Sequence, residues 1–323
     1  MKYNFLGSTG LKVSAISLGC SGYWGQRIFS EKKAHKIIWE GLNLGINYFD
    51  TGHNYCKFNA EPRLGRVLRD IIKANDRSKI VVSSKAGTII PSASIFSKKR
   101  SQEKDFSPES IERSCEASIK NLTGDYLDIF HLHGVSQNEM TDDLITKLCS
   151  MKDKGLYRYL GVNTHDISFM TYMASKPDVF DVALVDYNVL QLDREPIIEK
   201  MNDSGIGVVA GTVLAQGHIL KGKIGTVKTV ADMWYLARAY LKSEGRALAS
   251  KSTEMRNLLA STPEISPAQA AIAFVLKNRS VASCTIGTTK LSNLSEIASS
   301  TEIQLSEKLV NTIRDTYTHI KAH

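Results

Sequence analysis

The sequence has no apolar run of the roughly 18 residues that a membrane-spanning helix needs. Its first residues, Met1 to Gly7, contain no apolar core of the kind found in signal peptides. Both absences argue against a membrane protein and against a secreted one. We therefore expect a cytoplasmic protein with no membrane partner.

Cysteine is scarce and irregularly spaced. The chain has five cysteines, an odd number without CxxC spacing: Cys20, Cys56, Cys115, Cys149 and Cys284. A disulfide framework requires paired cysteines, and a zinc site of the common kind requires ligands at short, regular spacings. We therefore expect reduced thiols and no bound metal.

Familiar phosphate-binding and nucleic-acid motifs are also missing. The chain contains neither GxGxxG nor GxxxxGK[ST], which argues against a Rossmann or P-loop phosphate site. The formal net charge is +8, but the basic residues are dispersed, and only Lys98 to Arg100 form a tight run. The excess positive charge therefore indicates a phosphorylated small molecule, and we expect no nucleic-acid partner.

The chain does contain a full core and a repeating order of strands and helices. Hydrophobic residues make up 42% and charged residues 23% of the 323 residues, without a break in composition, so we expect one domain over residues 1–323. Eight apolar segments predict strands that alternate with helical patterns: Val13–Leu18, Ile46–Asp50, Ile80–Lys85, Tyr126–His133, Tyr157–Val162, Val182–Tyr187, Val208–Gly211 and Cys284–Ile286. This alternation predicts an α/β fold, a (β/α)8 TIM barrel.

Three segments stand outside the repeating units. A Gly-rich turn within Leu6–Ser14 predicts an N-terminal β-hairpin ahead of the first barrel strand. The connections at residues 88–107 and 218–262 are longer than usual, and the second contains a helical pattern around Met233–Tyr240. In a barrel, both long loops would rise over the C-terminal face, where active sites lie. We expect these loops to shape the substrate site.

Four residues with useful chemistry fall at or just beyond the ends of predicted strands: Asp50, Tyr55, Lys85 and His133. In a barrel, these strand ends meet at one rim. Because a nearby ammonium favours a phenolate, Lys85 would lower the pKa of Tyr55, and Asp50 would keep Lys85 charged. Tyr55 could then exchange a proton with a substrate oxygen to which His133 donates a hydrogen bond.

Each of these residues also has an ordinary structural explanation. A lysine that ends a strand is more often solvated, and a histidine in an apolar run such as Phe130–His133 is more often a core residue. Because side chains alternate along a strand, His131 and His133 share a face. The pattern alone leaves open which of these two histidines reaches the site.

Segments along essentially the whole chain resemble the aldo-keto reductase superfamily: Leu6–Ser14, Gly45–Thr51 with Tyr55, Asp125–Asp128 with Leu132–His133, and Ser266–Gln269. The resemblance implies a (β/α)8 barrel that binds a nicotinamide dinucleotide in an extended form. It also implies that Asp50, Tyr55, Lys85 and His133 form the family's catalytic tetrad, and it selects His133 over His131.

The resemblance further implies a cofactor-binding set, namely Asn163, Thr164, Gly211, Thr212, Leu214, Gln216, Gly217, Gly287, Thr288, Thr289, Lys290, Asn293 and Glu296. Three departures from the family pattern stand out. The pair Asn163-Thr164 replaces the usual Ser-Asn, Leu184 replaces a common glutamine, and Gly211 replaces a common stacking tyrosine. Lys290 is either a contact for a 2′-phosphate or an exposed lysine at a helix start. NADP(H) is slightly favoured, and NAD(H) is the alternative.

These departures are similar to those of the branch with plant-type galactose dehydrogenases and related aldose dehydrogenases. We expect an NAD(P)-dependent oxidoreductase that moves hydride between nicotinamide and a small aldehyde, ketone or sugar. The alternatives are an NAD-dependent aldose dehydrogenase and, in another class, a cofactor-bound regulatory subunit with vestigial catalysis. Tyr23 and Trp24 are the predicted substrate contacts, although aromatic loop residues also serve ordinary packing. The sequence indicates neither the direction of the reaction nor the oligomeric state.

Overall fold

The computed structural model describes residues 1–26, 29–89, 103–220 and 243–322, without the side chains of residues 22–23 and 243–251. Eight parallel strands close into a barrel in the order β10-β11-β12-β3-β4-β5-β8-β9. The strands are β3 (Ile16–Gly19), β4 (Tyr48–Asp50), β5 (Val81–Ala86), β8 (Leu127–His133), β9 (Tyr157–Thr164), β10 (Val182–Asp186), β11 (Gly207–Gly211) and β12 (Val281–Ile286). The predicted barrel is confirmed.

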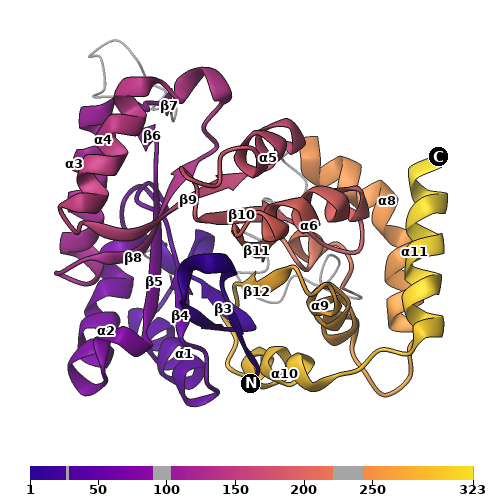
Figure 1. Cartoon of the computed structure of the whole chain (residues 1–323). Coiled ribbons are helices and arrows are strands. Elements are labelled where there is room, and N and C mark those ends of the chain that lie inside the picture. Colours follow the sequence, from indigo (N-terminus) through magenta and orange to yellow (C-terminus); the bar gives the residue numbers. More distant parts are fainter. Residues whose placement is uncertain (27–28, 90–102, 221–242, 323) are drawn as a thin grey trace, which may run out of the picture.

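Helices surround the barrel (Figure 1). Those described are α1 (Glu31–Asn43), α2 (Ala60–Ala74), α3 (Pro108–Leu122), α4 (Asp142–Asp153), α5 (Ile167–Ala174), α6 (Glu195–Asp203), α8 (Ser243–Ala260), α9 (Pro267–Lys277), α10 (Ser292–Ser299) and α11 (Glu307–Ala322). Over the described ranges, none of them is long and apolar enough to cross a membrane. The helical pattern predicted around Met233–Tyr240 lies outside the described residues.

Local sequence signals set the helix ends. Helix α1 presents its apolar stripe to the core and is followed by Gly45, whose φ of 88° is one that glycine adopts without strain. Helix α9 begins with a capping box, in which the Ser266 hydroxyl accepts from Gln269 N–H and the Gln269 side chain accepts from Ser266 N–H.

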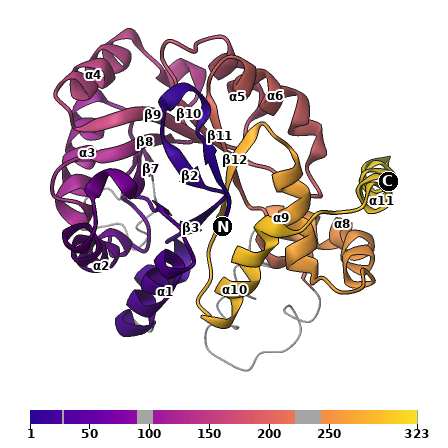
Figure 2. The same cartoon turned by 60° about the horizontal axis from the view of Figure 1, so that its bottom comes forward.

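A hairpin of β1 (Tyr3–Phe5) and β2 (Lys12–Ser14) lies across the N-terminal end of the barrel (Figure 2). Its residues Leu6, Leu11 and Val13 pack in one cluster with inward-facing barrel residues such as Tyr48 and Val209. The hairpin therefore closes this end with an apolar layer and leaves the opposite end for chemistry.

The prediction of one strand over Val13–Leu18 is wrong, because the chain bends at Ala15 and divides the segment between β2 and β3. At the bend, Ser14 N–H donates to Asn47 Oδ1 at 2.7 Å, and the Ser14 hydroxyl donates to the Ile16 carbonyl at 2.6 Å. An apolar run does not reveal such a change of direction.

Within the predicted loop at residues 88–107, two short segments pair as a two-stranded ribbon. Strand β6 (Thr88–Ile89) pairs antiparallel with β7 (Glu103–Lys104). Lys104 Nζ donates to the Thr88 hydroxyl at 3.1 Å and also to the carbonyl of His133. The ribbon is thereby fastened to the C-terminal end of β8.

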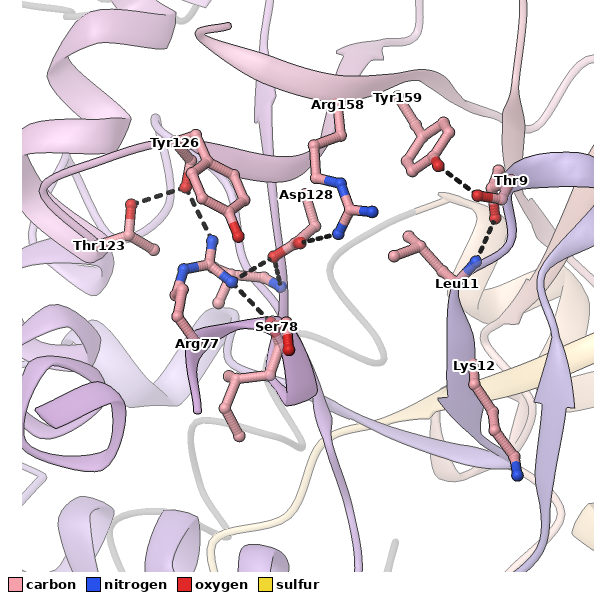
Figure 3. A network of polar contacts seen from close by, with 12 residues as sticks. Thr9, Leu11, Lys12, Arg77, Ser78, Thr123, Tyr126, Asp128, Arg158 and Tyr159 are labelled. Atoms are coloured by element: carbon pink, nitrogen blue, oxygen red, sulfur yellow. Dashed lines mark hydrogen bonds and ion pairs between the residues drawn. The ribbon is translucent and has the colours of Figure 1, made fainter. Parts of the chain in front are cut away.

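A buried carboxylate ties the early parts of β5 and β8 together (Figure 3). Asp128 is 1% exposed, and its Oδ2 accepts hydrogen bonds from Val82 N–H and from Arg77 Nη1, both at 2.9 Å. Arg158 Nη1 lies 3.3 Å from Asp128 Oδ1. Burial raises the pKa of Asp128, and the two arginines offset this effect only in part.

Arg77 extends this cluster to the surrounding backbone. It donates to the Ile80 carbonyl at 2.7 Å and to the Tyr126 carbonyl at 3.0 Å, and its guanidinium lies 4.1 Å from the centre of the Tyr126 ring. The cluster therefore fixes β5 and β8 relative to each other. The far ends of these two strands carry Lys85 and His133.

We expect Arg77→Met to destabilise the protein by about 3–5 kcal/mol, because it leaves the buried Asp128 carboxylate without its main partner. The exposed pair of Arg66 with Glu31 supplies a matched control, and Arg66→Met should change stability by less than about 1 kcal/mol. Urea denaturation measures both variants. Equal effects of the two substitutions would contradict the role given to the Asp128 cluster.

Candidate active site

A buried ion pair lies at the C-terminal end of the barrel, where β4 ends at Asp50 and β5 presents Lys85. Lys85 Nζ lies 2.6 Å from Asp50 Oδ1 and 2.5 Å from Oδ2, and it donates to the Thr51 carbonyl at 2.6 Å. The Ser83 hydroxyl donates to Asp50 Oδ1 at 2.6 Å. Burial alone would lower the pKa of Lys85, but Asp50 and Tyr55 outweigh it and raise the pKa, so the ammonium remains charged.

Tyr55 is brought beside this ammonium by the turn that follows β4. His53 N–H donates to the Lys85 carbonyl at 2.9 Å, which holds the turn against β5. Lys85 Nζ lies 5.3 Å from the centre of the Tyr55 ring. The next residues, 56–58, all have left-handed backbone, with φ of 54°, 56° and 66°. Such strain in residues other than glycine is concentrated at functional sites.

His133, the last residue of β8, contacts Tyr55. The two rings are edge to face, with centroids 5.9 Å apart and planes at 85°. Burial, together with the nearby charge of Lys85, lowers the pKa of His133 to about 3, so the imidazole is neutral near pH 7. Its Nδ1 has no hydrogen-bond partner among the described residues. A neutral imidazole carries one N–H and can donate one hydrogen bond.

His131 lies deeper in the barrel. It is fully buried and is the cross-strand partner of Lys85 in the ladder between β5 and β8. Gly161 of β9 makes room for the ring, since a Cβ at this position would lie 2.3 Å from His131 Nδ1. The histidine beside Tyr55 is therefore His133, and His131 occupies the interior.

Asn163 and Thr164, the first two predicted cofactor contacts, point in different directions. Asn163 is the cross-strand partner of His133, and its side-chain amide donates to the Leu184 carbonyl at 2.9 Å. The Thr164 hydroxyl instead accepts from Asp166 N–H at 3.1 Å, at the start of α5. Asn163 thus lies beside the catalytic candidates, whereas Thr164 serves the adjoining helix.

Gly211 ends β11, and the loop that follows carries four more predicted cofactor contacts: Thr212, Leu214, Gln216 and Gly217. Left-handed φ values of 49° at Thr212, 56° at Gln216 and 94° at Gly217 give it a tightly wound backbone. The sequence analysis missed the residue that holds this loop. Asn188, 1% exposed and two residues beyond the end of β10, donates to the Thr212 carbonyl at 3.1 Å. The sequence does contain a signal for this role, because the polar Asn188 directly follows the apolar segment Val182–Tyr187.

The last predicted contacts lie around the start of α10. Gly287 and Lys290 are exposed, whereas Thr288 and Thr289 are buried. The Thr288 hydroxyl accepts from Lys290 N–H and from the Asn293 side chain, both at 3.2 Å. Glu296 is turned away from this segment, since its carboxylate accepts from the Ser266 hydroxyl at the cap of α9.

Two side chains that would normally contact the nicotinamide are absent from the adjoining strand ends. A Cβ at Gly211 would lie 3.6 Å from Leu184 Cδ1, so these two departures from the family pattern are neighbours in space. Gly211 has no side chain and Leu184 has an aliphatic one, so neither position supplies an aromatic ring or a side-chain amide. An aromatic side chain that stacks on a bound nicotinamide ring would have to come from another part of the chain.

Of the two predicted substrate contacts, Tyr23 and Trp24, the structure describes the side chain of Trp24 only. Trp24, in the 3-10 turn Gly22–Gly25, is 3% exposed and packs edge to face on Phe29, with ring centroids 6.0 Å apart. Its ring belongs to the hydrophobic core. The side chain of Tyr23 lies outside the described residues.

Comparison with known proteins agrees with this architecture. The family model described as the aldo/keto reductase family matches residues 15–318. L-Galactose dehydrogenase of Arabidopsis thaliana is 27% identical over 314 residues, which cover 93% of this chain and 88% of that protein. L-Glyceraldehyde 3-phosphate reductase of Escherichia coli (strain K12) is 27% identical over 313 residues, which cover 92% and 86%.

A solved structure shows the same fold. Aldo-keto reductase AKR11C1 from Bacillus halodurans, in its holo form, matches with a TM-score of 0.74 at 22% identity, over 98% of this chain and 96% of that one. The family model spans nearly the whole chain and includes every strand of the barrel. The protein therefore belongs to the aldo/keto reductase family.

Proposed function

We propose that Asp50, Tyr55, Lys85 and His133 are the catalytic residues of an NAD(P)-dependent oxidoreductase that acts on a small carbonyl or hydroxyl compound. Membership of the aldo/keto reductase family supports the reaction class. The observation that carries the residue assignment is the Lys85 ammonium, which is bound by Asp50 and lies 5.3 Å from the Tyr55 ring centre.

Reduction of a carbonyl requires a hydride at carbon and a proton at oxygen. A bound reduced nicotinamide supplies the hydride. Tyr55 gives its hydroxyl proton to the substrate oxygen, and the adjacent Lys85 stabilises the phenolate that remains. His133 donates a hydrogen bond to the same oxygen and stabilises its developing negative charge. In the oxidation of an alcohol, the Tyr55 phenolate takes up the hydroxyl proton.

The rim of the barrel fits a dinucleotide in two places. The loop after β11 is tightly wound, with left-handed backbone at Thr212 and from Ala215 to Gly217, and the segment before α10 offers an exposed glycine and an exposed lysine, Gly287 and Lys290. Asn163 lies nearest the catalytic candidates and would hold the nicotinamide end. Within the described residues, the Lys290 ammonium has no hydrogen bond or ion pair, so it is available for a phosphate, and we assign NADP(H) as the cofactor.

An NAD-dependent aldose dehydrogenase is the second candidate. Leu184 and Gly211 depart from the usual nicotinamide contacts, and the match to L-galactose dehydrogenase points to a sugar substrate. A regulatory subunit with vestigial catalysis would show no turnover with either class of substrate. A cytoplasmic location remains our prediction.

We expect Tyr55→Phe to reduce kcat by about 100-fold or more in both directions, because it removes the proton donor. The control is Tyr172→Phe, which removes a hydroxyl from α5 on the outside of the barrel and should leave kcat unchanged. Steady-state assays with NADPH and aldehydes, and with NADP+ or NAD+ and aldoses, measure the effect. Undiminished turnover by Tyr55→Phe would refute the assignment.

The neutral state of His133 predicts the shape of the pH profile. Because its pKa is lowered to about 3, protonation of His133 does not affect the rate above about pH 5. The profile of kcat/KM for reduction should therefore have no acid limb near about 6.5, the ordinary pKa of histidine. An acid limb at that pH which disappears in His133→Gln would show that His133 titrates near its ordinary pKa, and it would contradict the neutral state assigned to this imidazole.

Lys290→Met tests the cofactor. If Lys290 contacts the 2′-phosphate, the substitution should weaken NADP+ binding about 10-fold through the loss of one charge-assisted contact, with little effect on NAD+. Lys308→Met, at an exposed position on α11, is the control. Fluorescence titration gives the Kd values. Equal affinity of the wild type and Lys290→Met for NADP+ would exclude the contact.

A further inference from the structure

A second histidine stands on the rim beside the catalytic candidates. Strand β9 ends at Thr164, and the next residue, His165, lies two positions beyond Asn163, the cross-strand partner of His133. The Gly134 N–H donates to the Asn163 carbonyl at 2.8 Å, which joins the two strand ends. His165 is close enough for its charge to contribute to lowering the pKa of His133. The ring is therefore at the mouth of the barrel.

The orientation of this ring is fixed from the neighbouring strand. His165 Nδ1 lies 2.7 Å from Oδ2 of Asp186, the last residue of β10, whose side chain is only 16% exposed. Because a carboxylate accepts hydrogen bonds and does not donate them, Nδ1 carries the hydrogen. The opposite nitrogen, Nε2, is thereby turned away from Asp186.

Arg194 holds the two strand ends that carry this pair. It lies in the short 3-10 turn Leu192–Arg194, donates to the Asp186 carbonyl at 2.7 Å and to the His165 carbonyl at 3.1 Å, and is 11% exposed. Its guanidinium also lies 3.8 Å from the Asp186 carboxylate. The backbone on both sides of the imidazole is therefore fixed.

The ion pair between His165 and Asp186 contributes little to stability. The side chain of His165 is 63% exposed, and exposed ion pairs typically stabilise a fold by less than about 1 kcal/mol. Arg194 alone would serve as a partner for the Asp186 carboxylate. A well-oriented but exposed imidazole next to reactive groups is what a ligand contact requires.

We propose that His165, oriented by Asp186, binds a hydroxyl group of the substrate close to its carbonyl and so selects hydroxylated aldehydes or sugars over simple aldehydes. This inference rests on the proposed function. A hydroxyl both donates and accepts, so it can pair with Nε2 in either protonation state of the ring. An anionic substituent would instead approach the negative charge of Asp186. Asp186 acts as a positioning residue, since it works through His165.

The test compares two substrates of equal carbon number, glyceraldehyde and propanal, which differ only in their hydroxyl groups. The measured quantity is the ratio of kcat/KM for glyceraldehyde to that for propanal. We expect His165→Phe to lower this ratio about 10-fold through the loss of one hydrogen bond, and Asp186→Asn to lower it about 3-fold. A merely structural role would affect both substrates alike and would leave the ratio unmoved.

A matched control comes from α11. His319 is 62% exposed and pairs with Glu254 at 3.1 Å, away from the rim, so His319→Phe should keep the wild-type ratio. His165→Gln, which retains a polar group, should lower the ratio less than His165→Phe. An unchanged ratio in His165→Phe overturns the inference alone. A wild-type protein that reduces neither aldehyde and oxidises no aldose overturns the proposed function, and the inference fails with it.

Discussion

The ion pair of Asp50 and Lys85 is the constraint around which the chemistry is arranged. An ammonium that is 1% exposed remains charged only because a carboxylate, a backbone carbonyl and a neighbouring phenol surround it. Its position is given by the barrel, since β4 and β5 are adjacent parallel strands whose ends meet. The turn that leaves β4 is held against β5 by the hydrogen bond from His53 N–H to the Lys85 carbonyl, and it places Tyr55 beside the ammonium.

The two ends of the barrel have different roles. The apolar hairpin closes the N-terminal end, and near that end the Asp128 cluster fixes β5 and β8 relative to each other. The C-terminal end carries Lys85 and His133 on these same strands. The apolar hairpin and the Asp128 cluster thus lie toward one end of the barrel, and the reactive side chains lie at the other. Small errors in the packing of the first end would be transmitted along rigid strands to the second.

Much of this arrangement could be predicted from the sequence, because it depends on signals that are local. Strands of apolar residues alternate with amphipathic helices, and reactive residues at strand ends in a barrel share a rim by geometry alone. Helix ends are local in the same way, since they depend on residues such as Ser266 at the start of α9 and Gly45 after α1. The resemblance to a family then separated His133 from His131, which alternation could not do.

The remaining features depend on contacts between distant residues. His165 and Asp186 are separated by 21 positions, and neither stands out until β9 and β10 are paired. The bend at Ala15 is made by Asn47, which an apolar pattern does not indicate. The role of Asn188 in holding the loop after β11 likewise appears only in three dimensions.

The central claim is that the Asp50–Lys85 pair makes Tyr55 a better acid. The direct measurement is the ionisation of the Tyr55 hydroxyl, followed by NMR of protein labelled with 13C in the tyrosine ring, in the wild type and in Lys85→Met, which removes the ammonium beside Tyr55. The account predicts that Tyr55 ionises at a lower pH in the wild type than in the variant. Ionisation of Tyr55 at the same pH in both proteins would contradict it.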